Sequence, residues 1–226
     1  MYKYETHLHT SPVSRCARVN VKENLEFYKA LGYDGVFITN HFIGGSIGID
    51  YYKPYEEQVN FYFSDYESAL EIGKTLGIKV FCGVEMTYGG SDFLIYGLDK
   101  AWFLAHPDIM EIKIRDRLKL MADSGALIIQ AHPFFEASYI DHIRLFPRDV
   151  HGVEVINATR SDEVNDMAKI YAEHYNLLKF AGSDNHRGKN KDKLAGIMCN
   201  EPILDVADFI EKFKNGKTDI FTIVNK

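Results

Sequence analysis

Apolar segments that end at metal-ligand side chains recur along this chain, and they constrain its fold more than any other feature. One segment near the amino terminus runs into His7 and His9, and one near the carboxyl terminus runs into Asp184 and His186. Side chains two residues apart in an extended strand point to the same face. Each pair can therefore reach a single ion, and the chain uses this arrangement twice with different ligands.

Three further apolar segments end at one candidate ligand each. They are 35–39 before His41, 79–84 before Glu85, and 126–130 before His132. The segments are short, rich in Val, Ile and Phe, and separated by helix-like stretches, which is typical of buried parallel strands. The carboxyl ends of such strands share one rim, and in an α/β barrel that rim carries the active site. The pattern therefore predicts an α/β fold with a metal site at this rim.

A single histidine beside an apolar strand is more often a hydrogen-bonded structural group than a ligand. The joint pattern favours ligands, because every candidate occupies the same position relative to a strand. The candidates are His7, His9, His41, Glu85, His132, Asp184 and His186. The other histidines end no predicted strand. His106 stays an outside candidate, because its loop follows the segment 93–98, which Asp92 and Asp99 flank.

Five segments that contain these candidates resemble, in order, the signature segments of the PHP (polymerase and histidinol phosphatase) superfamily. They are HLHT at 7–10, TNH at 39–41, GVE at 83–85, AHP at 131–133 and GSDNH at 182–186. The resemblance implies a distorted seven-stranded β/α (TIM-like) barrel that holds two or three divalent ions and hydrolyses phosphate esters. It carries over all seven candidates as metal ligands, with Glu85 as the bridging carboxylate.

Two positions depart from this family pattern. Most members have an aspartate where this chain has Asn40, and we interpret Asn40 as a residue that supports the neighbouring ligand. Members also usually have an aspartate or histidine five or six residues after the first histidine pair, and the stretch 11–17 contains neither. Cys16 in that stretch is a candidate extra ligand as a thiolate, although a lone buried thiol is the commoner state of a cysteine.

The predicted reaction is two-metal hydrolysis, in which a metal-activated hydroxide attacks phosphorus. Glu85 and Asp184 are the candidate catalytic carboxylates, and manganese, iron and zinc all suit the oxygen and imidazole ligands. Arg160 and Arg187 are the candidates for binding the substrate phosphate, because a guanidinium group binds phosphate oxygens in a planar fork. Arg15 and Arg18 rank second. A solvated loop arginine is the alternative for Arg160.

Composition fits one metallohydrolase domain over residues 1–226, since 46% apolar residues can fill one core of that size. The three cysteines predict no disulfide framework, and we expect a cytoplasmic protein without an export or membrane segment. The net charge of −6 is poorly suited to gripping long nucleic acid. A small phosphorylated substrate is the expected partner, and the sequence does not predict an oligomeric state.

Caps and periodicity predict five helices between the strands, at 21–31, 62–76, 108–124, 162–175 and 206–215. Additional strands are expected at 93–98, 152–156, 196–198 and 220–224. The glycine-rich and aromatic segment 42–63 follows His41 directly. It has two interpretations, a lid over the site or a long loop whose aromatic side chains pack on the barrel.

Other functions are compatible with parts of the pattern. The chain could be a catalytically silent metal-binding or regulatory domain, and the unusual stretch 11–17 keeps that alternative. Within the family, histidinol-phosphate phosphatase and short-oligonucleotide exonuclease are both open. Metal-dependent hydrolysis of carbon–nitrogen bonds shares the barrel and its histidine-rich rim, but those enzymes typically bridge their ions with a modified lysine. No lysine ends a candidate ligand strand here.

Overall fold

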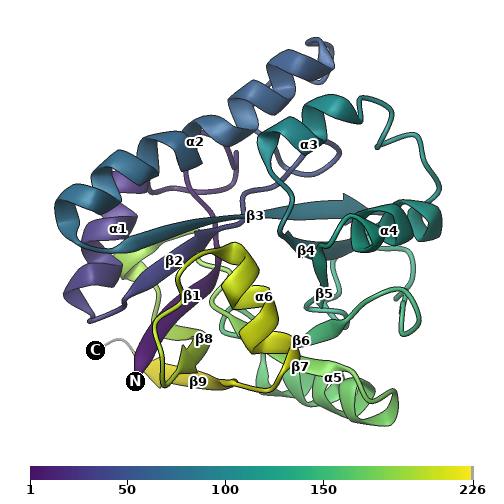
Figure 1. Cartoon of the computed structure of the whole chain (residues 1–226). Coiled ribbons are helices and arrows are strands. Elements are labelled where there is room, and N and C mark those ends of the chain that lie inside the picture. Colours follow the sequence, from purple (N-terminus) through teal and green to yellow (C-terminus); the bar gives the residue numbers. More distant parts are fainter. Residues whose placement is uncertain (225–226) are drawn as a thin grey trace.

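Nine strands form one mixed sheet in the computed structural model, which describes residues 1–224 (Figure 1). The strands are β1 (Tyr2–Leu8), β2 (Gly35–Ile38), β3 (Lys79–Tyr88), β4 (Ser91–Tyr96), β5 (Leu127–Ala131), β6 (Gly152–Asn157), β7 (Leu178–Gly182), β8 (Lys193–Cys199) and β9 (Thr218–Val224). Their order in the sheet is β7-β6-β5-β4-β3-β2-β1-β8-β9. The carboxyl end of β1 also contacts the loop that follows β7, through a parallel bridge between Leu8 and Asn185. The sheet is therefore a nearly closed barrel.

The prediction of seven strands was wrong in number, and the strands are not all parallel. Strand β4 runs antiparallel to both β3 and β5, and β8 and β9 extend the sheet from β1 as an antiparallel pair. The reason for the first reversal is local. Gly89 and Gly90 join β3 to β4 with φ angles of 54° and 82°, the conformation that a tight hairpin turn requires. Glu85 accordingly lies inside β3 and not at the end of a strand.

Six α-helices and one short 3-10 turn accompany the strands. They are α1 (Val21–Ala30), α2 (Tyr55–Leu76), α3 (Lys100–Ala105), α4 (Ile114–Asp123), α5 (Asp162–His174), η1 (Gly188–Asn190) and α6 (Val206–Lys214). The predicted N-cap of α1 is confirmed, since the Asn20 side chain accepts a hydrogen bond from the Glu23 backbone at 3.0 Å. None of the helices within residues 1–224 is long and apolar enough to cross a membrane.

Two helix predictions need correction. The expected helix 108–124 begins only at Ile114, and the short helix α3 before it was missed. Asp99 caps α3 by accepting from the Trp102 backbone at 2.8 Å, and Pro107 disfavours helical backbone at the residue before it, where α3 ends. Helix α2 begins at Tyr55, seven residues before its predicted start, directly after Pro54.

The segment 42–63 contains buried and exposed parts. Phe42, Tyr62 and Phe63 are buried, and Tyr62 donates hydrogen bonds to backbone oxygens just after β2 and within β3. These aromatic residues pack on the barrel, as one of the two interpretations expected, whereas Tyr51 and Tyr52 are exposed. Only the glycine-rich part, 44–46, borders the site described below.

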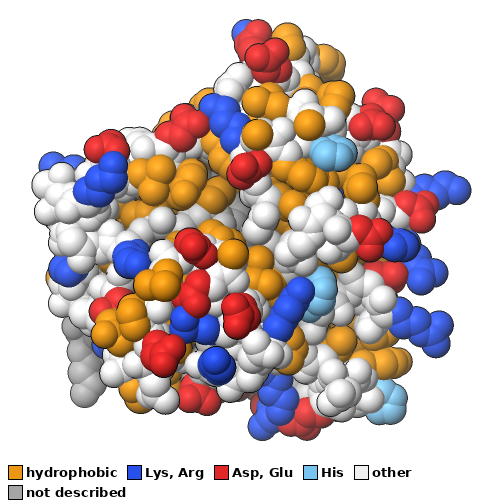
Figure 2. All heavy atoms as spheres, in the orientation of Figure 1, with side chains coloured by type: hydrophobic (Ala, Val, Ile, Leu, Met, Phe, Trp, Pro, Cys, Tyr) orange, Lys and Arg blue, Asp and Glu red, His pale blue; other side chains and the backbone are white. Residues whose placement is uncertain are grey.

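An apolar cluster fills the amino-terminal half of the barrel. Phe209 of α6 packs against Phe37 and Tyr96, with ring centroids 4.6 and 5.3 Å apart. This packing leaves the polar side chains at the opposite end, where the parallel strands finish. On the outer face shown in Figure 2, acidic and basic side chains are interspersed among hydrophobic ones.

Candidate metal centre

The structure brings all seven predicted ligands together at one end of the barrel. They come from six places in the fold: β1 (His7) and the residue after it (His9), the end of β2 (His41), β3 (Glu85), the end of β5 (His132) and the loop after β7 (Asp184 and His186). Each of these side chains contacts at least one other candidate ligand. The rim therefore concentrates five imidazoles and two carboxylates in one buried cluster.

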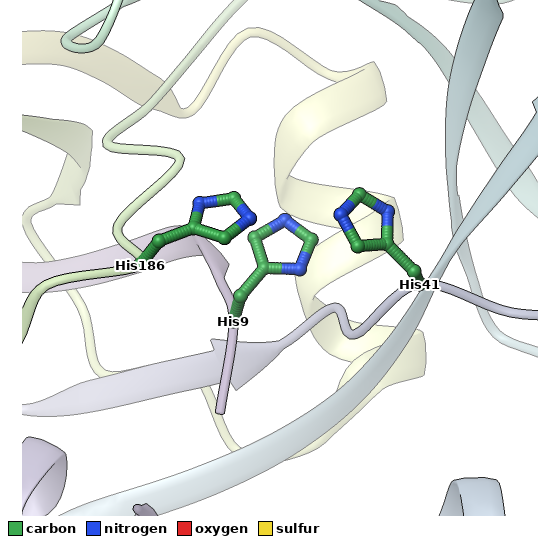
Figure 3. A group of neighbouring side chains, drawn as sticks. All are labelled: His9, His41 and His186. Carbon is green, nitrogen blue, oxygen red and sulfur yellow. The ribbon is translucent and has the colours of Figure 1, made fainter. Parts of the chain in front are cut away.

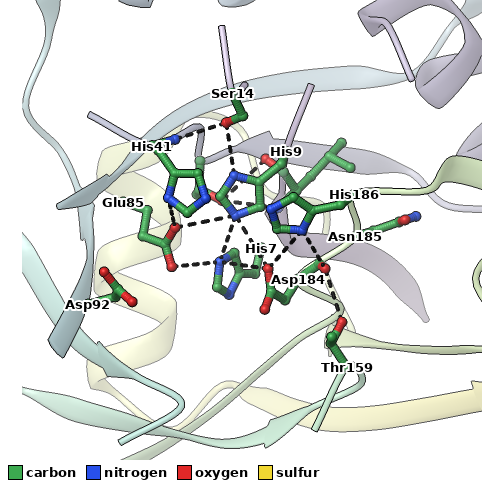
Figure 4. Close-up of polar contacts among 12 residues, drawn as sticks. His7, His9, Ser14, His41, Glu85, Asp92, Thr159, Asp184, Asn185 and His186 are labelled. Carbon is green, nitrogen blue, oxygen red and sulfur yellow. Dashed lines mark hydrogen bonds and ion pairs between the residues drawn. The ribbon is translucent and has the colours of Figure 1, made fainter. Parts of the chain in front are cut away.

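Glu85 faces several histidines of this cluster (Figure 4). Its Oε1 is 3.2 Å from His7 Nε2 and 3.4 Å from His132 Nε2. Its Oε2 is 3.4 Å from His9 Nε2 and 2.6 Å from His41 Nδ1. Each oxygen thus faces two imidazole nitrogens, so the two oxygens of Glu85 could contribute to neighbouring cations.

Asp184 approaches the same imidazoles from the other side. Its Oδ1 is 3.7 Å from His7 Nε2, 3.5 Å from His9 Nε2 and 3.2 Å from His186 Nδ1. Asp184 has a φ of 51°, and His132 has a φ of 26°, in the left-handed region that non-glycine residues seldom adopt. The Thr159 hydroxyl donates to the backbone oxygens of Ser183 and Asp184 and so holds this turn. Strained backbone of this kind concentrates at functional sites.

The ligand atoms form three overlapping groups, each with its atoms within 4.8 Å of one another. The groups are His9 with His41 and His186 (Figure 3), His7 with Glu85 and His132, and His7 with His9 and Asp184. Because His7 and His9 belong to two groups each, neighbouring cations would share ligands. The cluster is compatible with more than one divalent cation.

An orphaned pair of buried atoms supports this fit. Glu85 Oε2 and His41 Nδ1 are only 2.6 Å apart, yet neither has a hydrogen-bond partner within residues 1–224. Buried polar atoms without a partner are costly, and a shared cation would satisfy both. The imidazole and carboxylate donors suit manganese, iron or zinc.

Glu154 of β6 orients His7. Its Oε1 is 2.8 Å from His7 Nδ1, and its Oε2 accepts from the His132 backbone and from the Asn157 side chain. A carboxylate on the outer nitrogen of an imidazole fixes the other nitrogen toward the metal. Sequence analysis missed Glu154, although a charged side chain inside the apolar segment 152–156 was a signal that it has a specific partner.

Ser14 orients His9 in a similar way. The Ser14 hydroxyl donates its one proton to Asn40 Oδ1 at 2.7 Å, and its oxygen lies 3.0 Å from His9 Nδ1. Because that proton is already used, His9 Nδ1 must be the donor. The lone pair of His9 then sits on Nε2, which faces Glu85 and Asp184.

Asn40, one of the two departures from the family pattern, links this network to a second carboxylate. Its Oδ1 accepts from the Thr10 backbone at 2.7 Å, and its amide donates to Thr10 Oγ1 at 2.8 Å and toward Asp65 Oδ2 at 3.4 Å. Thr10 in turn donates to Asp65 at 2.6 Å. An aspartate at position 40 has no amide proton to donate and would place a second charge beside Asp65.

Close packing of opposite charges shifts several pKa values. Burial favours the neutral form of His7, but Glu154, Asp184 and Glu85 outweigh it and raise the pKa well above its usual value. Burial also opposes the charged form of Glu85, yet the surrounding histidines hold its pKa well below the usual range. His9 differs, because burial and the neighbouring imidazoles lower its pKa well below normal.

Cys16 lies exposed at the mouth of the cluster, within hydrogen-bonding reach of His186 and His41. Partial burial raises the pKa of its thiol, but these two histidines outweigh that effect and lower it to about 6. The pKa of His186 is about 9, because its contacts with Asp184 and Cys16 outweigh burial. The predicted extra ligand is thus beside the predicted metal ligands.

The two predicted phosphate-binding arginines have different surroundings. Arg160 donates to Asp184 Oδ2 at 3.1 Å and stacks 3.5 Å above the centre of the Phe135 ring. Its buried Nε has no partner within the described chain. Arg187 is exposed and lines a recess beside the cluster together with Arg18 and Arg160. Arg15 lines neither this recess nor the one described next.

A second recess, of about 530 Å³, opens above the ligands and is lined by 44–46, Phe135 and Tyr139. Asp92 faces this recess from β4. It accepts from the Thr87 hydroxyl at 2.6 Å and lies 3.9 Å from His132 Nε2. Burial and the nearby Glu85 raise the pKa of Asp92. Sequence analysis noted Asp92 only beside a strand and missed its place in the site.

His106 is not part of the cluster. Its Nδ1 is 2.7 Å from the Trp102 backbone oxygen, and its ring stacks on Trp102 at the end of α3. The outside candidate from the sequence is therefore a local structural group.

No protein-family model matches the sequence, and no curated protein matches it. Solved structures do match. A two-domain protein from Bacteroides vulgatus containing a predicted PHP-like metal-dependent phosphoesterase superposes with a TM-score of 0.69 and 18% identity, over 97% of this chain and 64% of that one. This chain has the PHP-type fold. A putative metal-dependent phosphoesterase from Bifidobacterium adolescentis also superposes, with a TM-score of 0.56 and 13% identity over 83% of this chain and 88% of that one.

Two other neighbours have different functional descriptions. One is a lesion-specific endonuclease from Pyrococcus furiosus, with a TM-score of 0.62 and 12% identity over 97% of this chain and 57% of that one. The other is an amidohydrolase from Chromobacterium violaceum, with a TM-score of 0.58 and 13% identity over 96% and 97% of the chains. At these identities the likeness shows the fold and not the substrate.

Proposed function

We propose that this chain is a metal-dependent phosphoesterase that hydrolyses a small phosphorylated metabolite or nucleotide. The observation that carries the proposal is the position of Glu85, whose two oxygens face four imidazole nitrogens while Asp184 closes the other side. A cluster of this kind is far richer in ligands than a structural ion needs. The proposed metal ligands are His7, His9, His41, Glu85, His132, Asp184 and His186.

Two or three divalent cations, manganese, iron or zinc, fit this ligand set. Such cations, when bound, polarise phosphoryl oxygens and lower the pKa of water. The chain's own contribution is orientation. Glu154 and Ser14 fix the tautomers of His7 and His9, so that their Nε2 atoms face the two carboxylates.

Arg160 is the proposed phosphate-binding residue within the site. Its contacts with Asp184 and Phe135 hold the guanidinium plane in place, and its partnerless Nε remains able to donate. A pre-oriented guanidinium loses little freedom when it binds a phosphate oxygen. Arg187 and Arg18 add positive charge in the adjoining recess. These local charges accommodate a small anion although the net charge of the protein is −6.

The shapes of the two recesses favour a small substrate. Phe135 and Tyr139 offer an aromatic wall to an organic group on one side of the cluster, and arginines line the other side. Each recess has a volume of about 530 Å³, which is the size of a small-ligand pocket. Long nucleic acid is not the proposed partner.

The test combines metal analysis with a substrate panel. Protein prepared without chelator is expected to contain at least two equivalents of metal by plasma mass spectrometry and to release phosphate from small phosphomonoesters. Apo-protein should be inactive and regain activity with manganese, iron or zinc. A panel of amides and short oligonucleotides distinguishes the other reactions named for its structural neighbours. Full metal content without turnover on any panel would contradict the proposal and favour a silent metal-binding domain.

A further inference from the structure

We propose that Asp92 selects the leaving group of the substrate, by accepting a hydrogen bond from a hydroxyl or ammonium group close to the scissile ester bond. This inference rests on the proposed phosphoesterase function and specifies the class of alcohol that the site releases. The favoured substrates are phosphate monoesters of diols and amino alcohols. Asp92 is suited to this role by its place, because its side chain is 18% exposed and lines the recess that contains Phe135 and Tyr139.

Thr87 holds the Asp92 carboxylate in one orientation. The two residues lie directly opposite each other in the β3–β4 hairpin, and the Thr87 hydroxyl donates to Asp92 Oδ1 at 2.6 Å. Asp92 Oδ2 accepts no hydrogen bond from residues 1–224 and faces His132 Nε2 at 3.9 Å. One oxygen is thus held by the protein, and the other is left to accept from a ligand. A carboxylate that is already oriented loses little freedom when it binds.

The aromatic wall of the recess is attached to the same hairpin. Gly90, in the turn before β4, packs against Ile140 so closely that an added Cβ atom would lie 3.0 Å from the Ile140 side chain. This contact fixes the neighbouring Tyr139, which lines the recess together with Asp92 and Phe135. An organic group that enters the recess therefore meets an aromatic surface and a carboxylate at the same time.

The charges on the two sides of the cluster give a bound substrate its direction. The recess that Asp92 lines and the recess that Arg18 and Arg187 line share Arg160 as a common wall residue. Figure 4 shows Asp92 on the same side of the cluster as Glu85. Arginines attract a phosphate and a carboxylate repels it, so the phosphate binds toward Arg160 and the leaving group points toward Asp92. A leaving group with a negative charge of its own is then disfavoured, and one that donates a hydrogen bond is favoured.

The experiment compares substrates of one size on the metal-loaded full chain. Hydroxyethyl phosphate, aminoethyl phosphate, propyl phosphate and phosphoglycolate place a hydroxyl, an ammonium, a methyl or a carboxylate group at a similar distance from the ester oxygen. The value of kcat/KM should be at least about tenfold higher for the better of the hydroxyl and ammonium esters than for propyl phosphate, and lowest for phosphoglycolate. The first two substrates show which donor is preferred. Equal kcat/KM values for all four would overturn the inference.

Two variants test Asp92 itself. Asp92→Asn keeps the shape of the side chain but removes its charge, so the discrimination against phosphoglycolate should fall by at least about tenfold. Thr87→Val leaves the charge in place but frees the carboxylate to rotate, so the preference for the hydroxyl ester over propyl phosphate should fall severalfold while metal content stays the same. Asp123→Asn, at an exposed residue that pairs with Lys119, is the matched control and should keep every ratio. Unchanged ratios in Asp92→Asn would overturn the inference, and so would the loss of a metal equivalent, because Asp92 would then be a metal ligand.

A binding measurement separates this inference from the proposed function. Hydroxypropyl phosphonate and butyl phosphonate are the non-hydrolysable counterparts of hydroxyethyl phosphate and propyl phosphate, and calorimetry gives their Kd for the metal-loaded protein. The wild-type protein should bind the hydroxyl compound at least about tenfold more tightly, and Thr87→Val should lose most of this preference. That result in a protein that hydrolyses no phosphate ester would uphold the role of Asp92 while contradicting the proposed function. Equal binding of the two phosphonates to the wild-type protein would overturn the role of Asp92 even in an active phosphoesterase.

Discussion

The metal cluster at one end of the barrel and a groove at the other end differ in whether their polar atoms have hydrogen-bond partners. At the carboxyl end, buried atoms of Glu85, His41 and Arg160 have no partner within the described residues. At the other end, a groove of about 800 Å³ runs between α2, α3 and α6 and is lined by apolar side chains such as Trp102 and Ile210. This groove is larger than either recess beside the metal cluster.

The polar groups of the groove are already satisfied by their neighbours. Lys100 pairs with Glu67 at 2.8 Å, and Asp99 accepts from the Trp102 backbone at 2.8 Å. The comparison teaches that cavity size does not locate chemistry in this fold. The convergence of imidazole and carboxylate side chains from several strands distinguishes the cluster from the groove. Unsatisfied buried atoms alone do not, because they also occur elsewhere in the described chain, for example at Tyr33 and Arg117.

The largest effect is expected from a variant that disrupts the cluster at the carboxyl end of the barrel. Asp184→Asn removes a charge that faces three imidazoles, so turnover should fall by about 10²–10³-fold or more, with less metal bound per chain. Turnover of phosphomonoesters and plasma mass spectrometry measure the two quantities. Asp166→Asn on the exposed face of α5 is the matched control. Equal turnover in both variants would show that Asp184 does not contribute to the reaction.

Glu154→Gln tests whether the contact between Glu154 and the candidate ligand His7 contributes to metal affinity. The variant keeps the size of the side chain but weakens its hold on His7 Nδ1, so metal affinity should fall by about 10–100-fold. Titration in metal-buffered solutions measures this change. Glu211→Gln on the surface of α6 should leave affinity unchanged. The same affinity in both variants would show that His7 needs no fixed partner.

The pH dependence of the apo-protein should reveal the clustered charges. The pKa values of His7, His41 and His186 are raised, to about 9 for His186, so these groups stabilise the fold below pH 6.5 and lose that contribution as pH rises toward 9. The lowered pKa of Cys16 acts in the opposite direction, but it is one group against three. The free energy of unfolding should therefore fall between pH 6.5 and 9 in denaturant titrations, and a rise would contradict the charge assignment.

Asn40→Asp should have a smaller effect, through the network behind His9. The variant loses its donor to Thr10 and places a carboxylate beside Asp65, so the free energy of unfolding should fall by about 1–3 kcal/mol. Denaturant titration measures the loss. The double variant Asn40→Asp with Asp65→Asn exchanges the two groups and should recover part of the stability. Additive losses would argue against coupling between positions 40 and 65.

The smallest effect is expected at the groove. Leu104 is 37% exposed and lines it, so Leu104→Ser should change the free energy of unfolding by only about 0.5 kcal/mol and leave metal content unaltered. Turnover should also stay at the wild-type level. A large loss of turnover in Leu104→Ser would show that the far end of the barrel contributes to the site.

Local pattern predicted the ligands because they are a property of strands. The spacing of His7 and His9 follows the period of extended backbone, which places both members on one side. Asp184 and His186 lie in the loop after β7, where Asp184 has a φ of 51°, so the turn and not the strand period brings them together. Strand reversal was less visible, since the antiparallel direction of β4 follows from the two-glycine turn before it and not from its own apolar residues. The short helix α3 gave too weak a periodic signal to be recognised.

The sequence by itself determined which side chains are candidate metal ligands, because each lies within or just after an apolar strand. Only the tertiary structure decided which polar residues support them. Glu154, Ser14 and Asp65 come from β6, a loop and α2, and nothing in their local sequence names His7, His9 or Asn40 as partners. Hydrogen bonds between residues distant in sequence depend on how the elements pack, so they are fixed only when the barrel closes.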